Sequence, residues 1–409
     1  MRKMKDSGIE WIGEIPEGWT KNKVIRLFDT IGSGTTPKNI TSDFPVVNWI
    51  QSGDITGSFM PACKNVISAN LLSQYSALKV YPAPFIIIAM YGASVGNASI
   101  SLIDGCVNQA CCVLSSPSCN LHYAFYVIKS AQSYLVRKAV GGGQPNISQE
   151  TIKQLWLPLP PLSTQDIIVR NLDATCSKID DLLSSVHASI EEYKKLKQAV
   201  ITQAVTTLNC PNVKLKYLMD IIVDCPHETP IYTFTGNYLV IRTSDQSLAS
   251  LRCDEYMYRL DEAEYKKRTR RLTLDKDDIV YGREGSWGLA CLVPQSNKYC
   301  LGQRVMQFRC NTRLLYPKYA MYALNSETVY MQGALDTIGS TAPHVNISTI
   351  CNYLLPVPAL NEQKEITNYL DAKCAEIDKL IAKKEQLVKE LESYKKSLIY
   401  EVVTGKREV

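Results

Sequence analysis

Mostly hydrophobic residues recur at alternating spacings of four and three between residues 172 and 204, and again between residues 370 and 402. This spacing is typical of a helix that presents one continuous face to a partner helix. The positions on the two faces are Leu172, Cys176, Ile179, Leu183, Val186, Ile190, Tyr193, Lys197, Val200 and Ala204, and Leu370, Cys374, Ile377, Ile381, Lys384, Val388, Leu391, Lys395, Leu398 and Val402. At about 1.5 Å per residue, a helix of about 40 residues would reach on the order of 60 Å. The pattern therefore favours two long helices paired along this seam over two unrelated surface helices.

The two helical segments are copies of one another. LPLPPL, which starts at Leu157, is echoed by LPVPAL, which starts at Leu355, and matching residues follow at one constant offset as far as Thr206 and Thr404. The matched pairs are Gln165 with Gln363, Asp173 with Asp371, Cys176 with Cys374 and Asp180 with Asp378. An insertion of one residue would turn every later side chain off the seam, which explains why neither copy contains a gap. The prolines at the start of each copy end the preceding strand and let a helix begin.

The repeat extends into the rest of the chain, where its offset drifts as loop insertions would require. The matched segments are Thr36-Pro37 with Thr229-Pro230, Ile50–Asp54 with Ile241–Asp245, Tyr91-Gly92 with Tyr281-Gly282, Gln109 with Gln303, Tyr123–Tyr126 with Tyr319–Tyr322, and Asn146–Ser148 with Asn346–Ser348. The chain is thus predicted to consist of a globular domain (1–155), a helix (156–210), a second globular domain (211–353) and a second helix (354–409).

Short apolar or alternating runs bounded by Gly, Asp or Ser predict that both globular domains are mostly β. The predicted strands are Val46–Ile50, Phe85–Met90, Val107–Leu114, Tyr238–Arg242, Ile279–Tyr281, Leu289–Val293 and Val305–Cys310. One helix is expected in each domain, at Leu121–Ala139 and at Lys318–Ala334. The predicted fold class is α+β, with two mostly-β domains that carry a helix each, joined by two long antiparallel paired helices in an internal two-fold repeat.

Composition excludes several protein classes. The longest apolar run, around Phe85–Met90, is far shorter than a membrane span, and the N-terminus carries charges without an apolar signal region. The 14 cysteines are scattered without a CxxC pair, and the four histidines are isolated, so we expect reduced thiols in a cytoplasmic protein and no metal site. The net charge of +5 permits a nucleic-acid partner but does not require one.

Catalytic motifs are missing from the sequence. It contains no GxxxxGK[ST] phosphate loop, no dinucleotide-binding glycine fingerprint, and no Asn/Asp-Pro-Pro-Tyr/Phe segment such as amino-methyltransferases use to hold a flipped base. Glu264-Tyr265-Lys266 has the E-x-K outline of a nuclease metal site, but it lies in a charged stretch and is interpreted as solvated surface. We therefore expect that this chain alone is not an enzyme and holds no cofactor.

Polar and basic side chains in the loops of both halves are the candidate DNA-binding residues. Arginines at strand ends can read guanine edges with two hydrogen bonds, and Gln or Asn can read adenine. The basic runs Lys266–Arg268 and Arg270-Arg271, together with Lys38, Arg137-Lys138 and Lys153, could hold phosphates. For any single residue, a solvated surface or a local turn contact is an equally good interpretation. The candidates are Thr35, Thr36, Lys38, Gln51, Ser94, Gln144, Asn146, His227, Arg242, Arg270, Arg271, Arg283, Ser286, Arg304, Thr341 and His344.

Taken together, these motifs resemble the specificity (S) subunits of type I restriction-modification systems. The opening DSGIEWIGEIPEGW (Asp6–Trp19) is similar to the N-terminal signature of that family, and LPLPPLSTQ, LPVPALNEQ and the ending VTGKREV are similar to its conserved regions. GSGTTPK with VNWIQSGDI, and DCPHETP with YLVIRTSDQ, resemble the starts of two classes of target-recognition domain. The resemblance covers essentially the whole chain. One departure is the triple glycine at 141–143, where the second half has Gly339-Ser340-Thr341.

The resemblance implies a non-catalytic subunit that recognises double-stranded DNA. Each globular domain would read one half of a bipartite, asymmetric site, and the paired helices would fix the gap between the halves and dock two modification (M) subunits. Restriction (R) subunits are further potential partners. AdoMet, ATP and Mg would belong to those partner subunits. The implied location is the cytoplasm of a bacterium or archaeon.

Two other classes of function stay open on the sequence alone. One is a self-contained DNA methyltransferase or nuclease, against which the missing motifs count. The other is a coiled-coil adaptor that binds only protein, with the strand-rich halves as docking modules.

Overall fold

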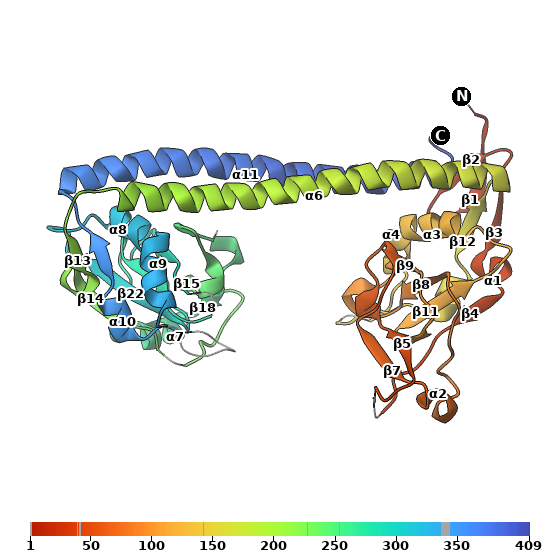
Figure 1. Cartoon of the computed structure of the whole chain (residues 1–409), viewed down its shortest axis with the longest axis horizontal. Helices are drawn as coiled ribbons and strands as arrows, with labels where there is room; N and C mark the ends of the chain where they lie inside the picture. The colour runs from red at the N-terminus through yellow and green to blue at the C-terminus, as the bar shows by residue number, and fades with distance from the viewer. Residues whose placement is uncertain are drawn as a thin grey trace. The chain divides into compact units, whose positions relative to one another are not determined.

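A computed structural model of the chain describes residues 2–38, 40, 42–141, 143–226, 228–252, 254–285, 287–336 and 344–409. The candidates His227, Ser286 and Thr341 lie outside the described residues. The chain divides into two compact units, which we call the first unit (Met1–Ser185 with Val388–Val409) and the second unit (Val186–Leu387). Figure 1 shows the elements of each unit. The described part of the chain contains no helix that is both long and apolar enough to cross a membrane.

The core of the first unit is a five-stranded sheet. Its strand order is β4 (Thr30–Gly32), β11 (Cys111–Ser115), β8 (Phe85–Ala89), β9 (Ala98–Ser101) and β6 (Phe59–Met60). Every residue of the central strand β8 is buried. Ile86 and Ile88 belong to one hydrophobic cluster, and Phe85, Ile87 and Ala89 to another. Alternate residues of β8 therefore fill the two sides of the sheet, which explains the continuous apolar run in the sequence.

Smaller elements complete the first unit. A three-stranded sheet has the order β10 (Cys106–Val107), β5 (Val46–Ile50) and β7 (Asn65–Ser68), and β10 runs parallel to β5. There are also two ribbons, β1 (Met4–Ile9) with β2 (Gly13–Pro16) and β3 (Thr20–Lys23) with β12 (Trp156–Leu159). The short helices are α1 (Val24–Leu27), α2 (Leu71–Gln74), α3 (Leu121–Ser130), α4 (Gln132–Arg137) and α5 (Gln149–Lys153).

The second unit repeats this plan. Its main sheet has the order β14 (Met219–Asp224), β22 (Val305–Cys310), β19 (Ile279–Gly282) and β20 (Ala290–Leu292). A three-stranded sheet has the order β18 (Arg259–Leu260), β15 (Tyr238–Ile241) and β21 (Tyr299–Leu301), and β15 and β21 are parallel. The ribbons are β13 (Asn212–Lys214) with β23 (Leu354–Pro356) and β16 (Gln246–Ser247) with β17 (Ser250–Leu251). The shorter helices are α7 (Glu262–Arg268), α8 (Pro317–Leu324), α9 (Glu327–Ala334) and α10 (Ile347–Cys351).

Two long helices, α6 (Leu162–Thr206) and α11 (Leu360–Val403), confirm the pairing expected from the seam. In the first unit, Leu172 and Ile179 of α6 share a hydrophobic cluster with Leu398 and Val402 of α11. In the second unit, residues from the end of α6 share a cluster with Leu370 from the start of α11. The early part of one helix thus meets the late part of the other, so the pairing is antiparallel, and Figure 1 shows the two helices side by side in the second unit. The α+β two-domain repeat is confirmed, whereas the four domain boundaries stay predictions.

The seam is displaced at the end of α6, whereas the predicted positions Leu398 and Val402 at the end of α11 are buried. Ile201 and Val205 are buried, whereas the expected positions Val200 and Ala204 are only partly buried. Ile201 and Val205 belong to the core of the second unit, so α6 turns its apolar face toward that core near its end. Of the other predicted seam positions, Ile190 and Ile377 are buried, while Leu183, Ile381 and Leu391 are partly buried.

The structure corrects two matches of the internal repeat. The backbone N–H of Ile147 donates to Met90 O at 2.9 Å, and that of Val345 donates to Arg283 O at 3.2 Å, so Ile147 corresponds to Val345. Asn146–Ser148 therefore matches His344–Asn346, not the identical letters Asn346–Ser348. The reason is helix capping: Ser148 and Asn346 occupy the N-cap positions of α5 and α10, where Ser and Asn are interchangeable.

The match of Tyr91-Gly92 with Tyr281-Gly282 is also wrong. Ala89 and Gly282 make the same pair of hydrogen bonds: Ala89 exchanges them with Asn97 and Gly96, and Gly282 with Leu289 and Gly288. Ile88-Ala89 therefore corresponds to Tyr281-Gly282, because the sheet register, not the Tyr-Gly dipeptide, fixes the alignment.

Three predicted elements are each divided in two. Val107–Leu114 is not one strand but β10 and β11, with a turn in which the N–H of Cys111 donates to Asn108 O at 3.2 Å. Leu121–Ala139 is α3 followed by α4, with Ala131 between them, where the N–H of Ala131 reaches the carbonyls three and four residues earlier. Lys318–Ala334 is α8 followed by α9, because the hydroxyl of Ser326 accepts from the N–H of Val329 and caps a new helix.

Candidate nucleic-acid interface

In each unit, two parallel strands end at the same edge of the small sheet. Ile50 at the end of β5 accepts a hydrogen bond from the N–H of Asn108 at 3.1 Å, and Ile241 at the end of β15 accepts one from Gly302 at 2.8 Å. The residues that follow these strands therefore lie close together. We call them the strand-end edge: Thr36, Gln51, Asn108 and Gln109 in the first unit, and Thr229, Arg242, Gly302 and Gln303 in the second.

A Thr–Gln pair stands at this edge in both units. The hydroxyl of Thr36 donates to Gln109 Oε1 at 2.6 Å, and Nε2 of Gln303 donates to Thr229 Oγ1 at 3.2 Å. Of these four residues only Thr36 was among the sequence candidates. Gln109, Thr229 and Gln303 could have been found, because both pairs are matched positions of the repeat.

An aspartate holds the next edge residue in both units. The backbone N–H of Gln51 donates to Asp54 Oδ2 at 2.9 Å, and that of Arg242 donates to Asp245 Oδ2 at 3.0 Å. Each aspartate is buried and lies in its own short 3-10 turn, Asp54 in Ser52–Asp54 and Asp245 in Thr243–Asp245. The match between Ile50–Asp54 and Ile241–Asp245 is thus confirmed, and it places Gln51 and Arg242 at equivalent positions.

The second unit carries a basic cluster beside this edge, made of Lys266, Lys267, Arg268, Arg270 and Arg271. Arg268 is buried, and its guanidinium donates to the carbonyl oxygens of Glu228 at 2.9 Å and Leu301 at 3.1 Å, so it joins the loop at Glu228 to the end of β21. Arg268 is therefore a structural cation, contrary to its interpretation as a phosphate ligand. Arg270 and Arg271 are exposed and line a cavity of about 250 Å³ together with Cys225, Pro226, Glu228, Lys267 and Arg268.

Other cations of the cluster are paired with acids. Lys267 Nζ lies 2.8 Å from Glu228 Oε2, and this hydrogen bond lowers the pKa of Glu228. Lys266 Nζ lies 2.6 Å from Glu262 Oε1, one helical turn away. Exposed pairs of this kind contribute little to stability, so both lysines could exchange their partner for a phosphate at low energetic cost.

A second group of candidates lies on loops that bridge to each other. In the first unit, Asn146 forms isolated β-bridges with Tyr91 and Val140, so the loop that carries Gln144 and Asn146 meets the segment that leads into the short helix with Ser94. In the second unit, His344 forms a bridge with Glu284, the neighbour of Arg283. These loops adjoin the strand-end edge, since Met90 N–H donates to Ala110 O at 2.7 Å and Arg283 N–H donates to Arg304 O at 2.9 Å.

The candidate side chains differ in accessibility. Gln144, Arg304 and Lys38 are exposed, whereas Thr35 and Ser94 are partly buried. Arg283 is buried, with Nη2 3.3 Å from Asp224 Oδ2 and 2.6 Å from Glu284 Oε1. Its guanidinium is thus engaged inside the unit and is not presented to solvent. Base or phosphate contacts by the remaining candidates stay predictions.

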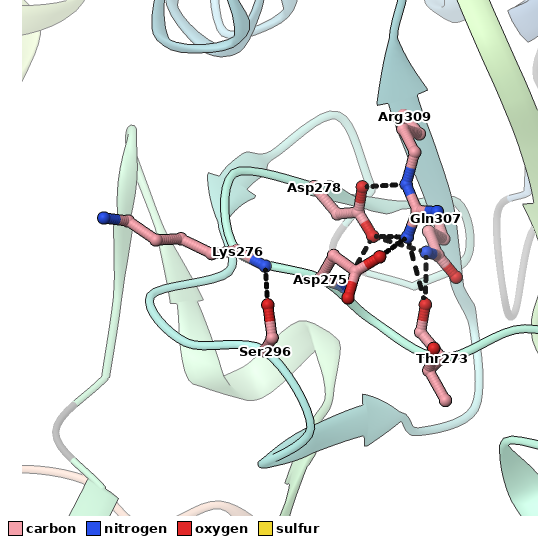
Figure 2. Close-up of polar contacts among 7 residues, drawn as sticks. All are labelled: Thr273, Asp275, Lys276, Asp278, Ser296, Gln307 and Arg309. Atoms are coloured by element: carbon pink, nitrogen blue, oxygen red, sulfur yellow. Dashed lines mark hydrogen bonds and ion pairs between the residues drawn. The ribbon is translucent and has the colours of Figure 1, made fainter.

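A larger cleft of about 670 Å³ lies elsewhere in the second unit, lined by Asp220, Asp275, Asp277, Asp278 and Arg309 among others. Figure 2 shows its polar network. The guanidinium of Arg309 donates to both oxygens of buried Asp278 at 2.8 Å, and Gln307 Nε2 donates to Asp278 Oδ2 at 2.7 Å. Arg309 also lies 2.6 Å from Asp275. These groups satisfy one another and fix the loop at 273–278 to β22, so we assign the network a structural role.

Metal-ligating groups do not gather anywhere in the described ranges: no cluster of three or more His, Cys, Asp or Glu side chains could hold an ion there. The cysteines that the structure describes have free thiols. Several of them are deeply buried, and burial raises the pKa of Cys112 and of Cys291 to about 12. A thiol with so high a pKa is a poor nucleophile at neutral pH.

Comparison with known proteins identifies the class of domain. The family profile of the type I restriction modification DNA specificity domain matches residues 16–192 and 224–390. The type I restriction enzyme MjaVIII specificity subunit of Methanocaldococcus jannaschii is 24% identical over 306 residues, which cover 69% of this chain and 69% of that protein. The type I restriction enzyme EcoBI specificity subunit of Escherichia coli is 21% identical over 377 residues, which cover 84% of this chain and 78% of that protein.

The fold has a solved counterpart. A structure described as the basis of complex assembly and conformational transition of the type I R-M system contains a chain that superposes with a TM-score of 0.69 at 16% sequence identity. The superposition covers 95% of this chain and 98% of that chain. At this level of identity the likeness concerns the fold alone.

Proposed function

Because the chain belongs to the type I restriction-modification DNA specificity family, we propose that its two units read the two halves of a bipartite DNA sequence, each through its strand-end edge and the adjoining loops. The chain is the DNA sequence-recognition subunit of a type I restriction-modification complex. The finer assignment, one half-site for each unit, follows from the repeat.

The observation that carries this proposal is that both units have the same backbone arrangement at the strand-end edge but different side chains at one matched position. The family profile matches both units, and both hold a Thr–Gln pair and an aspartate-anchored turn at the same edge. Yet the residue on the anchored turn is Gln51 in one unit and Arg242 in the other. Glutamine pairs best with adenine and arginine with guanine, so equal scaffolds with unequal side chains suit an asymmetric site.

The long helices supply the remaining parts of the function. Paired antiparallel helices form a stiff element, and half-sites about one helical turn of DNA apart present their major grooves on one face. We assign α6 and α11 the role of spacer and of docking surface for two M subunits. AdoMet binding, base flipping and methyl transfer then belong to the M subunits, and ATP-driven cleavage with Mg to an R subunit. This chain serves as a non-catalytic reader.

The deciding experiment is the methylation pattern of a host that lacks other adenine methylation. The chain is expressed with its M subunits, and methylated adenines are mapped. A two-part sequence with a fixed unread gap is expected. Replacing residues 210–352 with the corresponding segment of another specificity subunit should change one half-site only; a change in both would contradict the assignment of one unit to one half.

The same material separates the rival functions. Methyl transfer from AdoMet by the purified chain alone would establish a self-contained methyltransferase. A complex with M subunits that binds the mapped duplex no better than a scrambled duplex would establish a protein-binding adaptor. Binding must be compared at one salt concentration, because phosphate contacts alone make every duplex affinity fall with salt.

A further inference from the structure

The guanidinium of Arg242 is held along one of its edges by Asp245. Nε donates to Asp245 Oδ2 and Nη2 donates to Oδ1, both at 2.8 Å. The same carboxylate accepts the backbone N–H of Arg242 at 3.0 Å. The Asp245 side chain is 0% exposed and the Arg242 side chain 22% exposed. The two guanidinium hydrogen bonds to this buried carboxylate fix the plane of the guanidinium before any ligand arrives, and the backbone hydrogen bond holds the carboxylate in place.

An aromatic platform fixes the guanidinium from a second direction. Cζ of Arg242 lies 3.8 Å from the centroid of the Tyr258 ring, and Tyr232 packs against Tyr258 with centroids 4.5 Å apart. Gly302 makes room for the arginine stem, since a Cβ at Gly302 would come within 2.8 Å of Arg242 Cγ. The side chain is therefore confined by a carboxylate, a ring and a glycine from three different segments.

The remaining edge of the guanidinium is the one formed by Nη1 and Nη2. The two side-chain hydrogen bonds to Asp245 use Nε and Nη2, so Nη1 takes no part in the carboxylate anchor, and the guanidinium also has a side-chain hydrogen bond with Tyr258. This edge presents two parallel N–H donors, and guanine is the base whose major-groove edge presents two adjacent acceptors, O6 and N7. An arginine fixed by an aspartate behind it loses less rotamer freedom on binding than a free arginine does.

Two other candidate arginines of this region, Arg283 and Arg304, each lack one of these properties. Arg283 is buried in ion pairs with Asp224 and Glu284. Arg304 is exposed, but no described carboxylate anchors it. At the position equivalent to Arg242, the first unit has Gln51, which anchors the same kind of aspartate through its backbone only. Of these three candidate arginines, Arg242 is the one that is both anchored by a carboxylate and partly exposed at the strand-end edge.

We propose that Arg242 is a specificity-determining residue of the second unit and reads one guanine of its half-site through the Nη1–Nη2 edge, with Asp245 and Tyr258 as positioning residues. This inference rests on the proposed function, in which the second unit reads a half-site of its own. It predicts that the half-site altered by exchanging residues 210–352 contains a required guanine.

The test compares Arg242→Gln, Arg242→Lys and the control Arg313→Gln in the full chain with its M subunits. Arg313 is exposed and follows the far end of β22, whereas Arg304 precedes β22. Methylated sites are mapped for each variant. Binding is also measured on duplexes that carry either guanine or 7-deazaguanine, a base without the N7 acceptor, at the required position. Thermal melting reports whether each variant folds, and Arg242→Lys keeps the charge beside Asp245 if the glutamine variant does not fold.

For the native complex, 7-deazaguanine should weaken binding roughly five-fold or more, since a bidentate arginine–guanine contact discriminates by about 5- to 150-fold. A folded Arg242→Gln or Arg242→Lys variant should relax the requirement for that one guanine, lose sensitivity to 7-deazaguanine, and keep the other half-site. Arg313→Gln should match the native pattern. A half-site without guanine, or folded Arg242 variants that keep the native sequence, would overturn the proposal for Arg242. Absence of any bipartite site in the native complex would instead overturn the proposed function.

Discussion

Lys197 Nζ donates to both carboxylate oxygens of Asp378, at 2.9 and 2.8 Å, from a position in the mostly apolar seam of α6 and α11. Lys395 makes the same contact with Asp180 in the first unit, at 2.6 and 2.7 Å. Lys197 matches Lys395 in the repeat, and Asp180 matches Asp378, so each helix contributes one lysine and one aspartate. A lysine in a helix seam costs stability but fixes register, because only one alignment brings it to its carboxylate. The two ion pairs therefore define the alignment of the helices within each unit.

Removal of the aspartate should destabilise the protein more than removal of the lysine. Lys197 has a side-chain exposure of 10%, whereas that of Asp378 is 53%. Asp378→Ala leaves a buried ammonium without its carboxylate, and we expect a loss of about 1 to 2 kcal/mol in the free energy of unfolding. Lys197→Met leaves a carboxylate that water can solvate, and we expect a change within about 1 kcal/mol. Urea unfolding of both variants measures the difference.

The equivalent variants of the other pair, Asp180→Ala and Lys395→Met, provide a matched comparison. Lys395 is also mostly buried, with a side-chain exposure of 18% against 58% for Asp180. The same order of destabilisation is expected. If Lys197→Met and Lys395→Met proved more damaging than the two alanine variants, the assignment of the buried cation as the sensitive partner would be wrong.

Insertions of seven residues should be tolerated only when both helices receive one. Asp180 precedes Lys197 on α6 by the same number of residues as Asp378 precedes Lys395 on α11. An insertion between Asp180 and Lys197 with a matching one between Asp378 and Lys395 keeps the seven-residue pattern of the seam, so the protein should fold and the unread gap in its recognition sequence should lengthen. Methylated-site mapping would give the gap, and unchanged half-site bases are the internal control.

A one-sided insertion provides the contrast. Seven extra residues between Asp180 and Lys197 alone would prevent both ion pairs from forming in register, so thermal stability should fall and methylation should be lost. A single-helix insertion that melts like the native protein and lengthens the gap would show that the two helices do not set the spacing together.

The long helices were predictable because their signal is periodic over many turns. Four predicted seam positions, Leu172, Ile179, Leu370 and Ile377, are all buried in the structure. The register of the globular repeats was less predictable, because short identical words mislead. Asn-Ile-Ser occurs twice, but the two copies differ by two positions in the structure, since one tripeptide ends at an N-cap and the other begins at one.

The candidate interface was only partly predictable for a different reason. Sequence shows residue types but not their partners. Arg242 and Arg283 looked alike, as arginines beside glycine, serine or threonine at strand ends, yet one lies partly exposed on a tyrosine and the other is buried between two acids. That difference depends on residues distant in sequence, such as Tyr258 and Asp224, which only the folded unit brings to them.

A tyrosine hydrogen bond attaches each globular core to a long helix, and its loss should affect the two units unequally. The hydroxyl of Tyr126 donates to Asp173 Oδ1 at 2.6 Å, and that of Tyr322 donates to Asp371 Oδ1 at 2.8 Å. Asp371 also binds Lys318 Nζ at 2.6 Å, whereas the described contacts of Asp173 include no cation. Tyr126→Phe should therefore cost about 1 to 2 kcal/mol, and Tyr322→Phe less. Equal losses in urea unfolding would contradict the compensating role of Lys318.

Buried thiols should make the protein less stable as the pH rises above 9. Burial raises the pKa of Cys291 from 9.0 to about 12. Between these values the unfolded chain releases the thiol proton and the folded chain keeps it, so the contribution of this thiol is fully present below pH 9 and declines as the pH rises toward 12. From pH 8 to pH 10 the loss should be about 1 kcal/mol for each such thiol. Urea unfolding at pH 8, 9 and 10 should therefore show a steeper decline for the native chain than for Cys291→Ala, and likewise for Cys112→Ala in the first unit. Because lysines and tyrosines that titrate in this range are common to all three proteins, only the difference in slope reports on the thiol, and equal slopes would mean that the thiol is not held protonated by burial.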